Sequence, residues 1–381
     1  MNFYFSEDLN LLRDEARKFL AEQCPPKAVR RILEGEAPFD RALWKQVAAM
    51  GWLGAAVPEN YGGAGLGHEG LCVLAEEIGR VLAPIPFASS VYLATEAIVA
   101  HGTEAQKEKY LPALATGELI GALAIAEGPD NPRPEAVRAR VANGRLSAAK
   151  WPVVDGSIAD LAIVVARNEH DVPSLFIVDL NGEGVARDAL KTVDPTRNQA
   201  RVTFDNAPAE PLCSGWDAVQ GLLDRAAVLI AFEQVGGSQA CLEMATAYAK
   251  ERIAFGRPIG SFQAIKHKLA DVYVATELAR SNAYYGAWAL QSNAPELAVA
   301  AAAARVSATD AFHLASKENI QTHGGMGFTW ELDCHLFYRR AKMLALALGS
   351  SKHWKGRLVD CWQAQGDAAK AVTAAAAQRT H

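Results

Sequence analysis

The chain has 381 residues, of which 50% are hydrophobic and 21% charged, and its formal net charge is −5. This composition excludes a disordered chain, a disulfide scaffold and a collagen-like fibre, and the mild acidic excess argues against a nucleic-acid-binding surface. At roughly 150 residues per domain, the length predicts two or three domains.

The first third of the chain is predicted to be helical. Apolar residues recur at helical spacing over residues 7–23, a stretch that ends at Pro25-Pro26. Further helices are expected over residues 41–50, 70–81, 91–101 and 106–116. Together they define an N-terminal helical domain over residues 1–118.

The middle of the chain, residues 119–212, is expected to be a β domain. Strand-length stretches that are apolar or alternating, separated by Gly, Pro, Asn and Asp, cover residues 119–126, 161–166, 174–178 and 200–204. Asn143-Gly144, between two further stretches of this kind, is typical of a β-hairpin turn.

Long helices return after residue 213. Helical periodicity over residues 217–252, 263–292, 296–322 and 337–363 predicts a four-helix bundle over residues 213–365. The tail, residues 366–381, is alanine-rich without a further apolar stripe, and we expect a frayed helix or disorder there. The succession of segments predicts a mainly α protein of the α+β class, because an α/β fold would alternate strand and helix throughout.

The sequence predicts a cytoplasmic protein without a membrane span. The N-terminus lacks the basic segment and apolar run of a signal peptide, and no uncharged apolar stretch reaches the roughly 18 residues of a spanning helix. The six cysteines have neither CxxC nor metal-ligand spacing, so we expect free thiols and no metal site.

Four segments carry motifs, at residues 57–65, 101–118, 251–263 and 321–328. In this order and spacing they resemble the acyl-CoA dehydrogenase family of flavoproteins, over roughly residues 5 to 360, and in particular the divergent subunits of its heterotetrameric or steroid- and branched-substrate members. The resemblance implies that the middle domain is a β-barrel. It also implies FAD as cofactor, an acyl-CoA substrate, a homo- or heterotetramer, and an electron-transfer flavoprotein as electron acceptor.

The resemblance puts one half of the FAD site on the bundle, where it serves a neighbouring subunit. Arg252 would pair with the pyrophosphate through charge-assisted hydrogen bonds, Phe255 would pack on the flavin nucleotide, and Gln263 would bond the adenine end. Close approach of the backbone to the cofactor would be allowed at Gln321, Gly324 and Gly325. The structural alternatives are an ordinary helix-end arginine at Arg252 and a helix C-cap at the two glycines.

The other half of the FAD site departs from the family pattern. Ala126 replaces the hydroxyl residue of a Thr-Glu-Pro-Gly-type loop. Pro152 stands where a tryptophan covers the flavin, and Val154 stands where a threonine bonds near flavin N5. We therefore expect weaker binding of a flavin by this chain's own β domain.

The usual position of the catalytic base is also altered. Counting from the family motif puts Leu348 where the glutamate stands, and leucine cannot accept a proton. Some members carry the base on the first long bundle helix, where Asp224 lies near the matching position. Asp224 is therefore the candidate base, with an aspartate stabilised by the helix dipole as the alternative. Glu233, in an apolar run, is a second candidate, unless it pairs with an arginine of the bundle.

The resemblance predicts FAD-dependent α,β-dehydrogenation of an acyl-CoA thioester to the trans-2-enoyl-CoA. The alternative is a non-catalytic or half-site subunit of a heterotetramer that completes the FAD site of a partner, because the half serving a neighbour is intact. A relative with other flavin chemistry, such as an oxidase, is the third possibility. His323 is expected to cap or pack rather than to catalyse.

Overall fold

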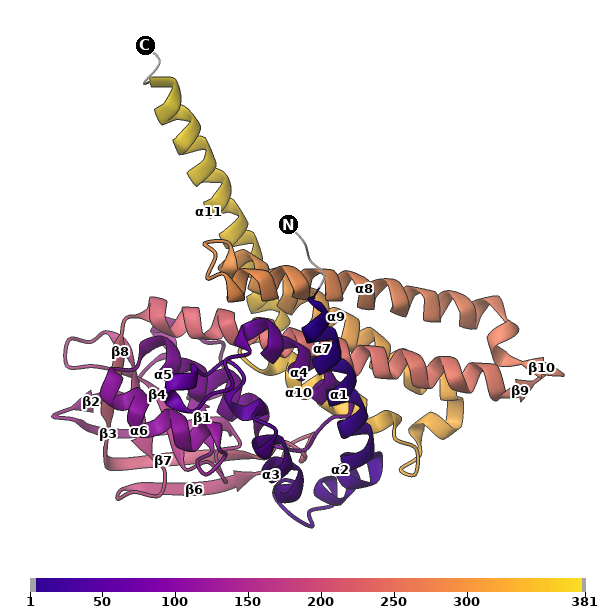
Figure 1. Cartoon of the computed structure of the whole chain (residues 1–381), viewed down its shortest axis with the longest axis horizontal. Coiled ribbons are helices and arrows are strands. Elements are labelled where there is room, and N and C mark those ends of the chain that lie inside the picture. Colours follow the sequence, from indigo (N-terminus) through magenta and orange to yellow (C-terminus); the bar gives the residue numbers. More distant parts are fainter. Residues whose placement is uncertain (1–4, 379–381) are drawn as a thin grey trace.

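The computed structural model describes residues 5–378, with side chains to residue 366. It has a helical N-terminal part, a central sheet and a C-terminal helical bundle, in that chain order (Figure 1). This is the mainly α, α+β fold that the sequence predicts. None of the helices in this part of the chain has the length and hydropathy that a membrane crossing requires.

The N-terminal helices follow the predicted periodicity, with one addition. α2 (Pro26–Leu33) begins at the second proline of the Pro25-Pro26 pair that follows the first helix, because proline is tolerated in the first turn of a helix. The α-helices of this part are α1 (Glu7–Gln23), α2 (Pro26–Leu33), α3 (Arg41–Ala49), α4 (Gly67–Arg80), α5 (Glu96–His101) and α6 (Glu104–Ala115). A π-helical segment, Ala88–Thr95, leads into α5.

The central part is one eight-stranded sheet with the order β6-β7-β3-β2-β4-β5-β8, and β1 pairs with β4. The predicted hairpin is confirmed: Ala142 pairs with Arg145, and both Asn143 and Gly144 have positive φ, as a tight two-residue hairpin requires. The strands are β1 (Gly121–Ala124), β2 (Arg140–Ala142), β3 (Arg145–Val154), β4 (Leu161–Arg167), β5 (Pro173–Asp179), β6 (Val185–Leu190), β7 (Gln199–Pro208) and β8 (Glu210–Ser214).

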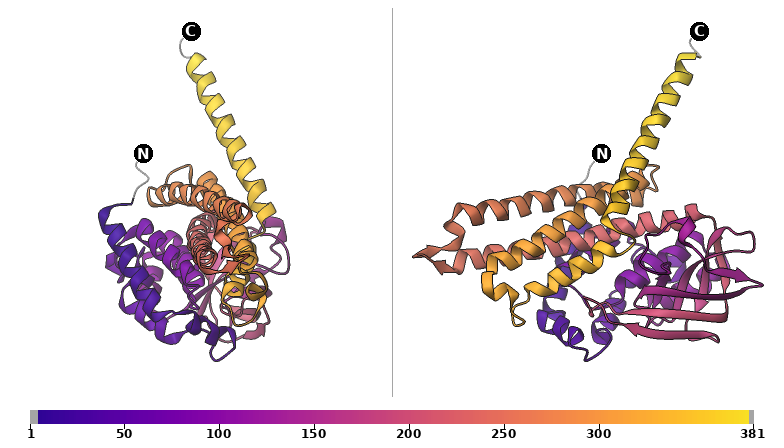
Figure 2. Two further views of the ribbon diagram at one scale, coloured as in Figure 1. Left: turned by 90° about the vertical axis from the view of Figure 1, so that its right-hand side faces the viewer. Right: turned by 180° about the vertical axis from the view of Figure 1, so that it is seen from behind.

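The C-terminal part is built around long helices that run side by side (Figures 1 and 2). Its helices are α7 (Trp216–Glu251), α8 (Gln263–Gln291), α9 (Leu297–His323), α10 (Cys334–Leu346) and α11 (Ser351–Gln378). Alanines in α9, such as Ala301 and Ala304, are fully buried, so much of the alanine excess lies where helices pack closely. A short hairpin of β9 (Ile253–Ala254) and β10 (Arg257–Pro258) joins α7 to α8.

The expected single helix over residues 337–363 is wrong. The chain forms α10 and α11 there, separated by a turn in which Leu348 and Gly349 both have positive φ, at 61° and 104°. α11 then continues through the expected tail to Gln378 and projects away from the body (Figure 2). Residues 379–381 of that tail lie outside the described residues.

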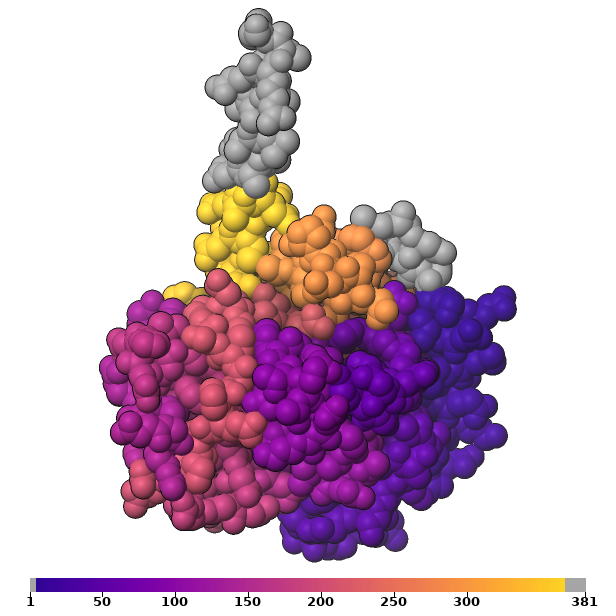
Figure 3. All heavy atoms as spheres, turned by 60° about the vertical axis from the view of Figure 1, so that its left-hand side comes forward, coloured from indigo at the N-terminus to yellow at the C-terminus, as the bar shows by residue number. Residues whose placement is uncertain are grey.

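The N-terminal part is joined closely to the bundle and to the sheet (Figure 3). Two glycines allow α4 to cross α7 at contact distance: a Cβ at Gly236 would lie 1.9 Å from the Glu76 carbonyl oxygen, and one at Gly79 would lie 2.0 Å from that of Glu233. Because these neighbours are backbone atoms, which a side-chain movement cannot clear, any larger residue at these positions would push the two helices apart.

An ion cluster of His68, Glu96 and Arg225 also joins these parts. Glu96 is buried, accepts from the Arg225 Nε, and lies 3.1 Å from the His68 Nε2. Burial alone would raise the pKa of Glu96, but His68 and Arg225 lower it to about 2. The carboxylate is therefore ionised in the folded protein at any pH above that value.

This cluster predicts a specific loss of stability in acid. The folded pKa of Glu96 lies below the roughly 4.3 of an unfolded glutamate, so its stabilisation is present above pH ~4.3 and is lost as pH falls towards 2. We expect this group to account for about 2 kcal/mol of unfolding free energy between pH 6 and pH 3. Urea unfolding of the wild type and Glu96→Gln at both pH values measures it; an identical pH dependence in the variant would refute the assignment.

Candidate functional site

The residues predicted to bind FAD meet at one end of the bundle. The C-terminus of α7, the β9–β10 hairpin, the N-terminus of α8 and the C-terminus of α9 all lie there (Figure 1). The ring of Tyr248 stacks on that of His323 with centroids 4.2 Å apart, which joins the last turns of α7 and α9. His323 is buried and its Nδ1 donates to the Asn319 carbonyl, so it packs, as expected.

The residues predicted to bind FAD lie on the surface, where another molecule can reach them. Phe255 is 95% exposed and has a positive φ at the tip of the hairpin, and an uncovered phenylalanine of this kind marks an interaction surface. Nothing lies within 4 Å of a Cβ built at Gly324 or Gly325, so another molecule can reach the backbone. The remaining predicted residues at this end are also exposed: Arg252, Gln263 and Gln321.

Together with neighbouring apolar side chains, these residues form what we call the bundle-end patch. Its apolar members, from the hairpin and from the segment directly after α9, are Ile253, Phe255, Met326 and Phe328, each about half exposed or more. Among the described residues no carboxylate pairs with Arg252, which follows the C-terminus of α7. The patch therefore offers a free cation, open glycine backbone and apolar surface, a combination that fits the nucleotide part of FAD.

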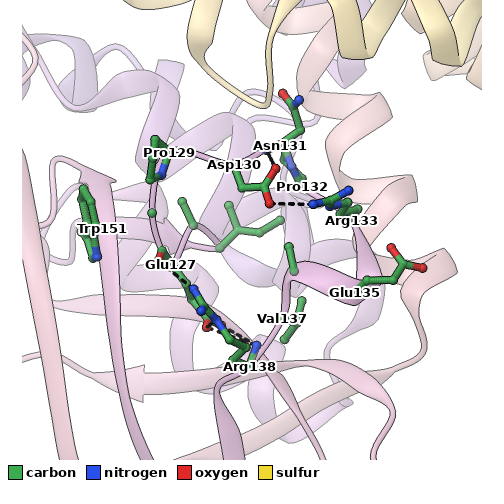
Figure 4. Close-up of a pocket in the computed structure, with 14 residues that line it drawn as sticks. Glu127, Pro129, Asp130, Asn131, Pro132, Arg133, Glu135, Val137, Arg138 and Trp151 are labelled. Atoms are coloured by element: carbon green, nitrogen blue, oxygen red, sulfur yellow. Dashed lines mark hydrogen bonds and ion pairs between the residues drawn. The ribbon is translucent and has the colours of Figure 1, made fainter.

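A cavity of about 610 Å³ opens on the central sheet (Figure 4). It is lined by residues 125–138, which follow β1, and by Trp151 of β3. The Trp151 amide donates to the Ala126 carbonyl at 2.8 Å, so these two walls are held together by backbone bonds. Pro152 was assigned the tryptophan position of the family pattern, but the Trp151 ring lines the cavity one residue earlier.

The two arginines that line this cavity are paired with carboxylates. Arg133 donates to Asp130 at 2.8 Å, and Arg138 pairs with Glu127 (Figure 4). Glu127 also accepts from the buried Lys150 Nζ at 2.8 Å, and Lys150 and backbone amides lower the pKa of Glu127 against the effect of burial. Both arginines of the cavity already have a carboxylate partner, which distinguishes them from Arg252.

The α10–α11 turn lies beside the same cavity. The Ser350 amide donates to the Asn131 side chain at 2.9 Å, and a Cβ at Gly349 would lie 3.1 Å from Pro132. Leu348, in the middle of the turn, is 9% exposed, and its carbonyl accepts from the Trp354 indole at 3.0 Å. The turn next to the cavity loop therefore carries an apolar side chain, that of Leu348.

Asp224, the candidate base, has strong partners. It is buried on α7, and Arg357 of α11 donates to both of its oxygens, with Nε 2.8 Å from Oδ1. Gln220 also donates to Oδ1, at 3.2 Å. Burial raises the pKa of Asp224, while Arg357 and Gln220 oppose that rise. The carboxylate stabilises the contact between α7 and α11 and is not a free group.

Glu233, the second candidate, pairs with arginines, as its structural alternative predicts. Its Oε1 accepts from Arg197 at 2.8 Å and from Arg340 at 3.1 Å, and all three side chains are buried. Arg340 also donates to Asp194 at 2.6 Å. Glu233 is therefore part of a network that connects α7, α10 and the segment before β7.

Comparisons with family models and with known proteins point to the same family. Residues 6–118 match the family model of the acyl-CoA dehydrogenase N-terminal domain, and residues 214–359 match that of the C-terminal domain. The chain is 33% identical to acyl-CoA dehydrogenase IpdE2 of Mycobacterium tuberculosis over 92% of this chain and 96% of the relative.

Two solved structures have nearly the same fold. A variant of the steroid ACAD Tcur3481-Tcur3483 is 31% identical, with a TM-score of 0.86 over 95% of this chain and 99% of that one. The ChsE4-ChsE5 complex from Mycobacterium tuberculosis is 27% identical, with a TM-score of 0.86 over 94% of this chain and 98% of that one.

Proposed function

The chain belongs to the acyl-CoA dehydrogenase family, whose members bind FAD, and we propose that it acts in α,β-dehydrogenation of an acyl-CoA thioester as one subunit of a heterotetramer. In this proposal the bundle-end patch completes the FAD site of a partner subunit. The names of its relatives, which include a steroid ACAD and a two-protein complex, support a steroid-like or branched acyl chain as substrate.

One contrast carries the proposal: Arg252 of the bundle-end patch has no ion pair among the described residues, while the arginines of the cavity and the carboxylates considered as bases are paired within the chain. Arg252 would bond the pyrophosphate, Phe255 would cover the nucleotide, and Gln263 would bond the adenine end. FAD would come close to the backbone at Gln321, Gly324 and Gly325. FAD, when bound, supplies the two-electron oxidation of the acyl chain.

On the chain's own side, every group considered as a base has another role. Asp224 is paired with Arg357, Glu233 with Arg197 and Arg340, and Leu348 has no proton-accepting atom. A base must be within reach of the proton that it removes and free to accept it. We therefore assign the removal of the α proton to the partner subunit.

An anaerobic titration tests this assignment. The chain is purified alone and also co-expressed with a homologous partner, and each preparation is titrated with a steroid side-chain acyl-CoA while the flavin spectrum is recorded. Bleaching in the pair and none in the lone chain is expected. Bleaching by the lone chain at the rate of the pair would overturn the assignment.

A second candidate function is dehydrogenation by this chain itself, with Asp224 as base and an electron-transfer flavoprotein as acceptor. The burial that raises the pKa of Asp224 favours it, because a base with a higher pKa binds a proton more readily. In this case Asp224→Asn should slow flavin reduction by about 100-fold or more with FAD retained. The exposed Asp217→Asn on the same helix is the control, and full activity of Asp224→Asn would exclude this role.

A further inference from the structure

Arg305 is a buried cation without an ion-pair partner among the described residues. It lies on α9, is 1% exposed, and donates through Nη1 to Gln234 at 2.7 Å and to Thr309 at 2.9 Å. Its Nη2 donates to the carbonyls of Leu344 and of Ala347, the latter at 2.7 Å, while Nε has no partner.

A buried guanidinium without an ion pair must be stabilised by other contacts. Removing a charge from water is costly unless it is paired, and burial lowers the pKa of Arg305 to about 9, which still leaves it charged at neutral pH. The last carbonyls of a helix have no intrahelical donors and carry the negative end of the helix dipole. Arg305 binds two carbonyls at the end of α10: that of Leu344, which also accepts from the Ala347 amide, and that of Ala347.

The same contacts fix the turn that follows α10. Beyond Ala347 the chain enters the positive-φ conformations of Leu348 and Gly349, and the Leu348 carbonyl is held by the Trp354 indole. The Ser350 amide then bonds to Asn131, in the loop that lines the 610 Å³ cavity. Arg305 is therefore linked to the cavity wall through one short turn.

We propose that Arg305 is a positioning residue that ends α10 and holds the Leu348–Ser350 turn against the cavity loop. Without the guanidinium the Ala347 carbonyl loses its donor, the Leu344 carbonyl keeps only the Ala347 amide, and the turn loses its fixed point on α9. The loop around Asn131 is then released at the cavity wall. That an acyl-CoA meets this wall rests on the proposed function, but the positioning itself does not.

Hydrogen exchange measured by mass spectrometry on the full chain tests the proposal without any ligand, so its failure is distinguishable from failure of the proposed function. Arg305→Met should speed amide exchange at least about tenfold in residues 344–354 and 128–133, because a local opening replaces a fixed turn. Arg305→Lys, which keeps the positive charge and can still donate to the carbonyls at the end of α10 but lacks the two-nitrogen fork, should restore part of the protection. Leu53→Ala, which truncates a fully buried side chain of the N-terminal part, controls for general loss of stability.

Equal acceleration in Arg305→Met and Leu53→Ala, or no rescue by lysine, would overturn the proposal. If Arg305→Met does not fold, two milder variants decide. Arg305→Lys should keep slow exchange over residues 344–354, and Asn131→Ala should speed exchange at Ser350 while leaving residues 344–347 unchanged. Fast exchange over residues 344–347 in Asn131→Ala would place the fixed point at the loop and not at Arg305.

Discussion

Glu233→Gln is expected to lower the free energy of unfolding by about 3 kcal/mol. The change keeps the shape of the side chain and removes its charge, so buried Arg197 loses its ion-pair partner, while buried Arg340 keeps only the pair with Asp194. An uncompensated buried charge is the costly outcome of breaking such a network, whatever the net value of the intact network. Urea unfolding at neutral pH measures the loss.

Glu243→Gln is the matched control for that experiment. Glu243 lies ten residues further along α7 and pairs with Arg80, but its side chain is 47% exposed. Exposed pairs contribute about 0 to 1 kcal/mol, because water screens the charges and the side chains lose entropy. A loss in Glu233→Gln no larger than in Glu243→Gln would show that the buried network does not hold α10 and the segment before β7 on α7.

Arg252→Ala is expected to weaken FAD binding by the assembled heterotetramer about 30-fold, which corresponds to about 2 kcal/mol for lost charge-assisted hydrogen bonds. Arg252 has no ion pair among the described residues, so its removal breaks no ion pair there. Thermal stability of the lone chain should therefore change little. Fluorescence titration of the flavin-free complex with FAD gives the affinity.

Arg201→Ala, an exposed arginine on β7, removes the same charge away from the patch. Its FAD affinity should equal that of the wild-type complex. Equal affinity in Arg252→Ala and Arg201→Ala would mean that the bundle-end patch does not bind the pyrophosphate. A fall in both variants would point to net charge and not to a local contact.

Much of the fold is predictable because its signals are local. The periodicity over residues 7–23 coincides with α1, and that over 217–252 ends one residue beyond α7. Strands β6 and β8 were missed because half-exposed edge segments lack a clear alternation. The break at Leu348 was missed for another reason: one of the contacts beside it comes from Arg305, which bonds to carbonyls 39 and 42 residues further along the chain.

In the candidate site, too, features with local sequence signals could be predicted and contacts between distant residues could not. The bundle-end residues are grouped in sequence by two motifs, so their meeting at one end of the bundle could be predicted. The partner of Asp224 could not, because Arg357 is 133 residues away and comes from a helix whose start was not predicted. Arg305 lies in an alanine run that gives only a weak signal: one charge within an otherwise apolar helical face.

The flavin content of purified protein tests the central claim most directly. The chain is expressed alone and with a homologous partner, and the ratio of FAD to protein is measured from the visible spectrum of each preparation. The account predicts a lone chain without flavin and a complex that retains FAD, with less FAD in the complex that carries Arg252→Ala. A lone chain that binds one FAD per subunit, and whose flavin content is unaffected by Arg252→Ala, would contradict it.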